Sequence, residues 1–268
     1  MTTPADLPPI VATLDDAGLA AALAGRASSA LIDLREAMGH VDPAALKDAG
    51  DRAAHDIIVA ALASARPDDA VLSEEGADDP ARLHADRVWI VDPLDGTREF
   101  SEPDRVDFAV HVALWERRGE DGELVTGSVA LPGLREVLTA GETQARPRVA
   151  EGPWRVAVSR TRAPEVAEVV AKQLDARLVA LGSAGYKVSA VLLGEVDAYV
   201  HAGGQYEWDS AAPVAVARAA GLHASRLDGS PLRYNRPDPR LPDLLISRPE
   251  LADEALAAVR ASGWTPQP

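Results

Sequence analysis

Two closely spaced carboxylates are the strongest chemical feature of this sequence. They belong to Asp92-Pro93-Leu94-Asp95-Gly96-Thr97, which follows the apolar run at residues 88–91. Two carboxylates this close at the end of a buried strand cannot both stay ionised without a compensating cation. Oxygen-rich ligand sets favour hard cations such as Mg²⁺. A solvated Asp-Gly turn is the alternative interpretation of these six residues.

Two further acidic segments lie elsewhere in the chain. Ser73-Glu74-Glu75-Gly76 follows a short apolar run, and Trp208-Asp209 opens a segment with a helical pattern. Taken singly, the first suits a surface turn and the second a helix N-cap, as does Asp51. Their joint occurrence in the two halves of the chain suggests subdomains that hold metal ions at their interface, and hence metal-assisted phosphate chemistry.

The spacing of apolar residues predicts the elements that position these acids. Helices are expected from about 15–38, 51–66, 164–174, 188–193, 209–219 and 249–261, and strands at 71–72, 88–91, 108–115, 124–131, 136–140, 154–159, 178–181, 197–200 and 244–247. The first half is therefore helices followed by an antiparallel meander, and the second half alternates helices with strands.

A stretch rich in Arg, Pro and Gly at residues 141–153 separates these two patterns. Such composition is typical of a domain boundary. We expect an N-terminal α+β subdomain, 1–148, that carries most of the metal ligands. A C-terminal α/β subdomain, 149–268, is expected to carry Asp209 and the substrate contacts.

Composition excludes several classes of protein. The 268 residues are 47% apolar, which is too high for a disordered chain. The 27 Lys and Arg against 42 Asp and Glu give a net charge of −15, which argues against a nucleic acid polymer as partner. The absence of cysteine from the sequence excludes disulfides, thiol nucleophiles and zinc–thiolate or iron–sulfur sites.

Membrane insertion and secretion are not expected either. No apolar run approaches the roughly 18 residues of a membrane span. Residues 1–10 also lack the basic start of a signal peptide. We therefore expect a cytoplasmic protein with no membrane partner.

Other catalytic motifs fit the sequence poorly. The second acid comes one residue too late for the Asp-x-Asp-x-Thr of haloacid-dehalogenase phosphatases, and the chain contains no P-loop. Ser159 and Ser183 lack a nucleophile-elbow pattern. The histidines show no metal-ligand spacing and are expected to be ordinary surface or satisfied residues; they are His40, His55, His84, His111, His201 and His223.

The acidic motifs, in their order along the chain, resemble those of the inositol monophosphatase superfamily of lithium-sensitive, Mg²⁺-dependent phosphatases. These motifs are Glu74-Glu75, Trp89 to Thr97, and Trp208-Asp209-Ser210-Ala211-Ala212-Pro213. Further segments are similar to the bisphosphate nucleotidase branch, namely Arg98 to Glu102, Gly182-Ser183-Ala184-Gly185-Tyr186-Lys187, Glu207-Trp208-Asp209 and Pro231 to Asn235. The resemblance covers about residues 15–250 and implies a layered αβαβα sandwich with two subdomains.

The resemblance also implies two to three Mg²⁺ ions per site. Their ligands would be Glu74, Asp92 and the Leu94 carbonyl for the first ion, Asp92, Asp95 and Asp209 for the second, and Asp51 with Glu74 for a third. Thr97, with Asp51 or Glu74 as carboxylate partner, would orient and deprotonate the attacking water.

Substrate contacts are implied for a wider set of residues. They are Asp95, Gly96, Thr97, Ser159, Arg160, Ser183, Gly185, Lys187, Glu207 and Asp209. Lys187 is one of only three lysines, and its position at a helix start suggests a contact to a second phosphate or a ribose. A solvated helix residue is the alternative, and Glu207 likewise has the alternative of being merely exposed.

The expected reaction is removal of the 3'-phosphate of 3'-phosphoadenosine 5'-phosphate to give AMP, a recycling step of sulfate assimilation. Inositol phosphate and fructose bisphosphate are the alternative substrates, and a catalytically silent metabolite or Mg²⁺ sensor is the non-enzymatic alternative. The Thr97 and Asp51 pair argues against a sensor, because binding alone needs no water activator. The resemblance further implies a homodimer.

Overall fold

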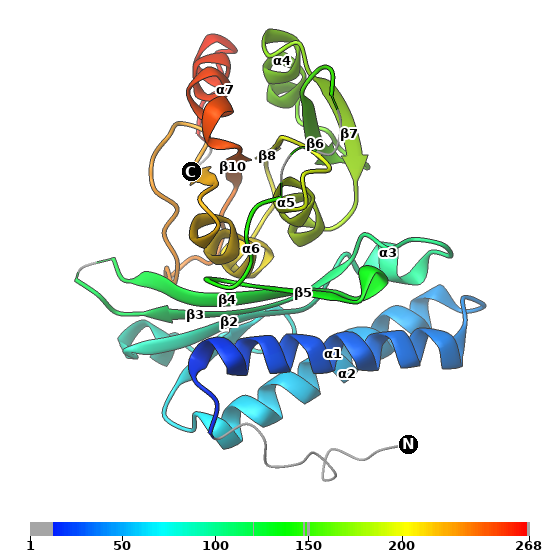
Figure 1. Cartoon of the computed structure of the whole chain (residues 1–268). Coiled ribbons are helices and arrows are strands. Elements are labelled where there is room, and N and C mark those ends of the chain that lie inside the picture. Colours follow the sequence, from blue (N-terminus) through cyan, green and yellow to red (C-terminus); the bar gives the residue numbers. More distant parts are fainter. Residues whose placement is uncertain (1–12, 120, 147, 149–150, 267–268) are drawn as a thin grey trace.

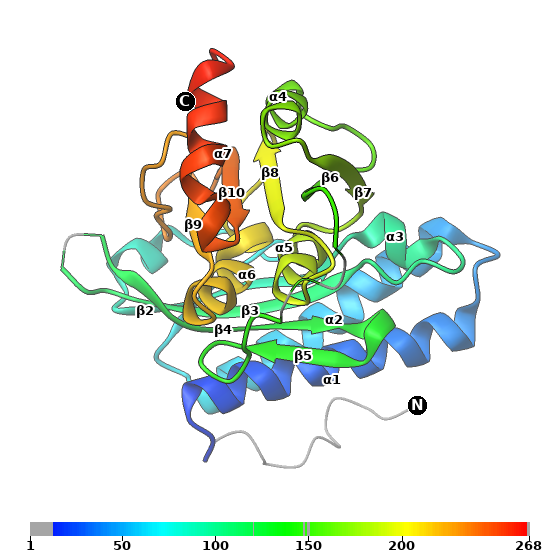
Figure 2. The same ribbon diagram turned by 45° about the horizontal axis from the view of Figure 1, so that its top comes forward.

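Five layers of helices and sheets build the molecule. The computed structural model describes residues 13–119, 121–146, 148 and 151–266. The layers run in the order helices, sheet, helices, sheet, helices (Figures 1 and 2). The layered αβαβα sandwich expected from the sequence is therefore confirmed.

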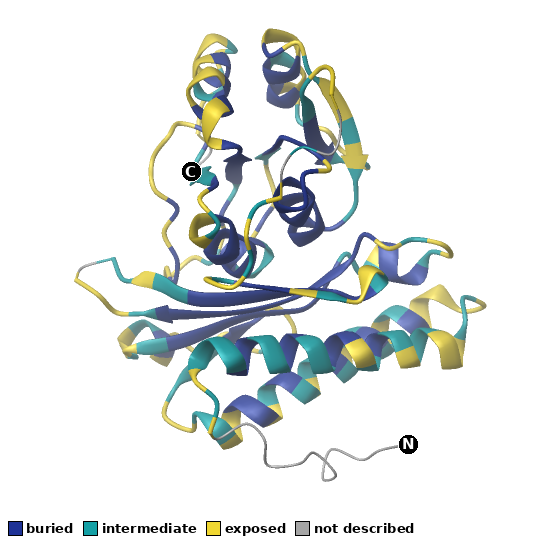
Figure 3. Cartoon of the chain, viewed as in Figure 1, coloured by how far each residue is buried: buried dark blue, intermediate teal, exposed yellow. Residues whose placement is uncertain are grey.

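Two long antiparallel helices, α1 (Asp16–Met38) and α2 (Pro43–Ala65), form the first layer. Their inner faces are buried against the first sheet and their outer faces are exposed (Figure 3). By length and composition alone α1 could cross a membrane. In this structure that apolar character serves packing, because Leu19, Leu23 and Leu31 are fully buried in the core beneath the sheet.

The expected start of the second helix near residue 51 is wrong. Asp42 caps the helix by accepting from the Ala45 amide, and Pro43 occupies its first turn. The helix then runs on through Gly50, whose missing side chain leaves room for the Phe100 ring; a Cβ there would lie 2.7 Å from Phe100 Cε1. Asp51 is consequently not a cap residue. It lies within the helix, on a face that can reach the end of the sheet.

The first sheet has the strand order β1-β2-β3-β4-β5. Its strands are β1 (Ala70–Ser73), β2 (Arg87–Asp95), β3 (Ala109–Glu116), β4 (Glu123–Leu131) and β5 (Glu136–Thr139). The meander from β2 to β5 is antiparallel as expected, whereas β1 pairs parallel to β2. A short helix, α3 (Thr97–Ser101), follows β2 and was not expected from the sequence.

The second sheet has the order β7-β6-β8-β10-β9. Its strands are β6 (Arg155–Ser159), β7 (Arg177–Leu181), β8 (Ala198–Ala202), β9 (His223–Ser225) and β10 (Asp243–Ser247). Strands β6, β7 and β8 are parallel, but β10 runs antiparallel to β8 and to β9, a short strand absent from the sequence prediction. Helices α4 (Glu165–Gln173) and α7 (Pro249–Ala261) cover the outer face of this sheet.

Helices α5 (Ala184–Leu192) and α6 (Glu207–Ala219) form the layer between the two sheets. One buried apolar cluster includes Ile90 and Val129 of the first sheet, Val191 and Val214 of these helices, and Ile246 of the second sheet. The two halves of the chain therefore share a core. The expected subdomain boundary at 148/149 adjoins residues 147, 149 and 150, which lie outside the described residues, and the division at that point stays a prediction.

Candidate active site

The pairing of β1 with β2 brings the first acids together. Because the two strands are parallel, with Ser73 opposite Val91, their carboxyl ends meet at one edge of the sheet. The Glu74 amide donates to the Val91 carbonyl at 3.2 Å, which places Glu74 beside Asp92. The acidic turn after β1 and the acidic motif that ends β2 are thus one site.

An irregularity in β2 explains how Asp92 and Asp95 share that site. Side chains three residues apart in a regular strand point to opposite faces of the sheet. Here the register with β3 shifts between Asp92 and Asp95, and such a bulge re-aims side chains. One ligand atom each from Asp92, Asp95 and His111 lies within 4.8 Å of the others.

Asp92 is the most deeply buried acid of the site, with 1% of its surface exposed. Its Oδ1 accepts from the Leu94 amide at 3.1 Å, while its Oδ2 has no hydrogen-bond partner in the described part of the chain. Burial, followed by the charges of Glu74 and Asp95, raises the pKa of Asp92 well above its ordinary value. A buried, unpaired carboxylate oxygen among other acids is suited to a cation.

Glu74 and Asp51 form the outer side of the cluster. Desolvation raises the pKa of Glu74 to about 7, and the charges of Asp95, Glu75 and Asp51 add to this. Desolvation and the charge of Glu75 raise the pKa of Asp51 to about 6. Glu74 as a whole residue is nevertheless exposed, so this side of the cluster is open to solvent.

Thr97 lies between the helix α2 and the end of β2. Its hydroxyl is 3.4 Å from Asp51 Oδ1 and 3.2 Å from the Leu94 carbonyl, both of which accept from it. The preceding Gly96 has φ +86°, a left-handed conformation that favours glycine, and a Cβ there would lie 2.9 Å from Ser183 Cβ. The turn after β2 thus packs directly against the start of α5.

The second half of the chain supplies the remaining acid and fixes Asp95. Asp95 Oδ2 accepts from the Ser183 hydroxyl and from the Gly185 amide, each at 2.6 Å. Asp209 Oδ2 accepts from the Tyr206 amide at 2.7 Å, and burial together with the Asp95 charge raises the pKa of Asp209 well above its ordinary value. Acids from the first sheet therefore face an acid from the helix layer between the two sheets.

This donor set suits hard divalent cations. The oxygens come from carboxylates and the Leu94 carbonyl, which are the ligands that such ions prefer. Mutual repulsion and burial make the cluster costly without positive charge, as the raised pKa values of Asp92 and Asp209 indicate. The structure thus brings Asp92 and Asp95 within 4.8 Å of each other and of His111. Glu74 and Asp209 lie close enough for their charges to raise the pKa of Asp92, and Asp51 lies at the side of Thr97.

A cavity of about 360 Å³ opens beside the acids. Its lining includes seven residues predicted from the sequence: Asp95, Gly96, Ser159, Arg160, Ser183, Lys187 and Asp209. Gly185 is buried behind Asp95. Glu207 is buried too, and its two carboxylate oxygens accept from the Asn235 and Arg236 amides at 2.6 and 2.8 Å. Its predicted substrate contact has no support from this geometry.

The predicted cations have different surroundings. Lys187 is 4% exposed, donates to the Gly182 carbonyl and lies over the Tyr199 ring, so the alternative of a solvated helix residue is wrong. Arg160 bonds to Glu99 at 2.6 Å and to Glu102 at 2.8 Å. These two carboxylates more than offset the positive charge of Arg160, whereas Lys187 has only a backbone carbonyl as its hydrogen-bond partner in the described chain.

Sequence analysis missed several residues of the site. His111, expected to be ordinary, is fully buried beside Asp92 and Asp95. His201 and Gln205 also line the cavity, and burial followed by the charge of Lys187 lowers the pKa of His201 to about 4. No spacing along the sequence could reveal His111, because its neighbours are Asp92 on the adjacent strand and residues at the starts of helices α5 and α6.

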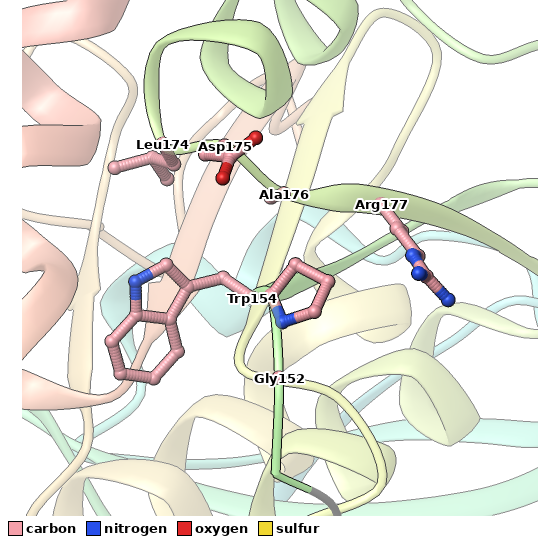
Figure 4. A pocket seen from close by; sticks show the side chains of 7 residues that line it. Gly152, Trp154, Leu174, Asp175, Ala176 and Arg177 are labelled. Carbon is pink, nitrogen blue, oxygen red and sulfur yellow. The ribbon is translucent and has the colours of Figure 1, made fainter.

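A larger cavity, of about 520 Å³, lies at the opposite end of strands β6 and β7 (Figure 4). Trp154 and Arg177, at the amino ends of β6 and β7, line it, whereas Ser159 and Leu181 at their carboxyl ends line the acidic cavity. It contains a single acid, Asp175, so its size does not make it the catalytic candidate.

Comparisons with known proteins identify the family and agree with the fold. A model of the inositol monophosphatase family matches residues 15–264. A 3'-phosphoadenosine 5'-phosphate phosphatase of Mycobacterium leprae is 51% identical over 257 residues, covering 93% of this chain and 95% of that protein. The 3'(2'),5'-bisphosphate nucleotidase CysQ of Escherichia coli K12 is 35% identical over 201 residues, covering 69% and 78%. The structure of CysQ from Bacteroides thetaiotaomicron matches with a TM-score of 0.69 at 28% identity, covering 86% of this chain and 96% of that one. The chain belongs to the inositol monophosphatase family.

Proposed function

We propose that this protein is a Mg²⁺-dependent phosphatase that converts 3'-phosphoadenosine 5'-phosphate to AMP and phosphate. The proposal rests mainly on the cluster of facing acids, in which Asp92 and Asp95 of the first sheet lie near Asp209 of helix α6, in the layer between the two sheets. The substrate assignment is supported by relatives of that name that are 51% and 53% identical to this chain.

We propose the ligand assignment that the family resemblance implies. The ligands would be Glu74, Asp92 and the Leu94 carbonyl for one ion, Asp92, Asp95 and Asp209 for a second, and Asp51 with Glu74 for a third. When bound, such ions lower the pKa of water and neutralise charge that develops on the phosphate and on the leaving oxygen.

Thr97 and Asp51 would handle the attacking water. The Thr97 hydroxyl, 3.4 Å from Asp51 Oδ1, can pass its own proton to that carboxylate while accepting one from water. In the metal-free protein burial raises the pKa of Asp51 to about 6, so this carboxylate is more basic than an ordinary Asp and suited to accept a proton in the transition state. Glu74 is the alternative base, with its pKa of about 7.

The cavity beyond Asp95 would receive the rest of the nucleotide. Lys187 lines it together with the hydroxyls of Ser159 and Ser183. Burial lowers the pKa of the Lys187 ammonium, and the charges of Asp95 and Glu99 oppose that shift and favour its charged form. A protein of net charge −15 needs such a local cation to accept a second phosphate. We therefore propose that Lys187 contacts the phosphate that does not react.

Phosphate release tests the proposal. Purified protein should hydrolyse 3'-phosphoadenosine 5'-phosphate with higher kcat/KM than inositol 1-phosphate or fructose 1,6-bisphosphate, and only with Mg²⁺. Asp209→Asn should remove most activity, because a neutral amide is a poorer ligand for a hard cation. Asp175→Asn, a change of the same kind at an exposed residue of the larger cavity, should not. Full turnover in EDTA, or by Asp209→Asn, would refute the assignment.

Two further properties expected from the sequence also remain proposals. A homodimer is testable by light scattering on a size-exclusion column, where a monomer mass near 28.2 kDa would contradict it. A cytoplasmic location is testable by cell fractionation.

A further inference from the structure

His111 occupies a central position among the acids although no motif marked it. It lies on β3 directly opposite Asp92 and has no exposed surface. Its Nδ1 is 3.0 Å from the Trp208 carbonyl. A carbonyl oxygen can only accept, so Nδ1 carries a proton and donates it to the residue that precedes Asp209.

The other ring nitrogen faces the start of α5. His111 Nε2 lies 3.4 Å from Asp95 Oδ2, the oxygen that also accepts from Ser183 and Gly185. A Cβ at residue 185 would lie only 1.9 Å from this nitrogen. The imidazole therefore fills the space that a side chain at 185 would need, which accounts for glycine at this position.

The ring thus contacts the three segments whose relative placement defines the site. It belongs to the first sheet, it bonds to the start of α6, and it packs on the start of α5. We propose that His111 is a positioning residue that holds Asp209 at the correct distance from Asp92 and Asp95 for a shared cation. This inference rests on the proposed metal-dependent function.

A role as a metal ligand fits His111 less well. Imidazole nitrogen suits zinc, copper or iron, whereas the surrounding oxygens suit magnesium or manganese. Nδ1 donates to the Trp208 carbonyl, and Gly185 packs against Nε2 so closely that no room for a Cβ remains between them. Residues that orient metal ligands are themselves important, since their loss typically costs about 10 to 100-fold in metal affinity.

Three substitutions separate positioning from simple packing. His111→Asn keeps an N–H near the position of Nδ1 and can still donate to the Trp208 carbonyl. His111→Gln places its amide near the position of Nε2 instead, and His111→Leu removes both nitrogens while keeping an apolar side chain. The proposal predicts that metal binding follows the Nδ1 position, whereas a purely space-filling role predicts no advantage for Asn over Gln.

Mn²⁺ serves as the probe, measured by electron paramagnetic resonance without substrate. His111→Leu should weaken its binding roughly tenfold or more, His111→Asn should bring it back to within about threefold of wild type, and His111→Gln should not. A second readout is the gain in Tm between EDTA and MnCl₂. A tenfold loss of affinity removes about 1.4 kcal/mol of that metal-linked stabilisation, whereas a packing defect lowers both transitions equally.

The outcomes are distinguishable. Wild-type affinity in His111→Leu, or equal affinities in the Asn and Gln variants, would overturn the positioning role while leaving the proposed function intact. If His111→Leu shows no cooperative unfolding, the comparison of Asn with Gln decides alone. Wild-type protein that binds no Mn²⁺ would overturn the proposed function and this inference together.

Discussion

Replacing Asp51 by Asn should stabilise the metal-free protein at pH 8, although it alters the candidate site. Desolvation, followed by the charge of Glu75, raises the pKa of Asp51 from 3.8 to about 6. The folded state therefore binds this proton more tightly than the unfolded chain does. The free energy of unfolding consequently falls as the pH rises from about 4 to about 6, and above pH 6 the ionised Asp51 is a net cost to stability.

The size of this cost follows from the shift in the pKa. A rise of about two units corresponds to about 3 kcal/mol at 1.36 kcal/mol per unit. Asp51 is only half-buried, so solvent screening reduces the figure to roughly 1 to 1.5 kcal/mol. In a chain of this size that is about 2 to 6 °C in Tm. An Asn side chain can still accept from Thr97 and has a similar helix propensity.

Thermal unfolding in EDTA at pH 4.5 and pH 8 checks the reasoning. Asp51→Asn should unfold at a higher temperature than wild type at pH 8, and the difference should shrink towards zero at pH 4.5. Asp56→Asn, at an exposed position of the same helix, is the matched control, because it removes one negative charge from a protein of net charge −15 without touching the cluster. An equal or lower Tm for Asp51→Asn at pH 8, or a gain matched by Asp56→Asn, would refute the argument.

Three further results are expected. Gly185→Ala should lower the free energy of unfolding by about 1 to 3 kcal/mol in chemical denaturation, because its Cβ would collide with His111. Gly25→Ala in helix α1 is the control: its Cβ would meet nothing closer than 3.6 Å, so it should raise the free energy of unfolding by about 0.5 to 1 kcal/mol. Lys187→Ala should cost roughly 1.5 to 3 kcal/mol more in kcat/KM with 3'-phosphoadenosine 5'-phosphate than with inositol 1-phosphate; equal losses would place Lys187 at the reacting centre or in the fold. LiCl should inhibit at submillimolar to millimolar concentrations by entering a carboxylate-bound metal position, and a titration identical to the KCl control would contradict an intact second site.

Local sequence patterns determined most of the secondary structure. Helix α1 and strands β2, β3 and β4 follow apolar periods that burial imposes on any chain of this composition. The errors arose where local signals were weak. The helix α2 begins eight residues before the expected Asp51, because Asp42-Pro43 provides a cap and first turn that the apolar pattern did not mark. The three-residue strand β9 (His223–Ser225) is too short to show an apolar period.

The proposed ligand set also came largely from the sequence. Asp92 and Asp95 lie only three residues apart in the chain, so a shared cation could be expected before any fold was known, although the bulge in β2 is what re-aims their side chains. Glu74 and Asp209 were assigned through resemblance, and the parallel pairing of β1 with β2 supplies the physical reason that Glu74 reaches Asp92.

Only the tertiary structure decided which other side chains belong to the site. His111 gains its position from a strand register and from the Trp208 carbonyl, which is 97 residues away in the chain. Lys187 is buried because α5 lies between two sheets, a fact that its own helix does not encode. Sequence patterns report the period of a single element, whereas these environments arise from the packing of several, and hydrogen bonds between distant segments leave no mark on local spacing.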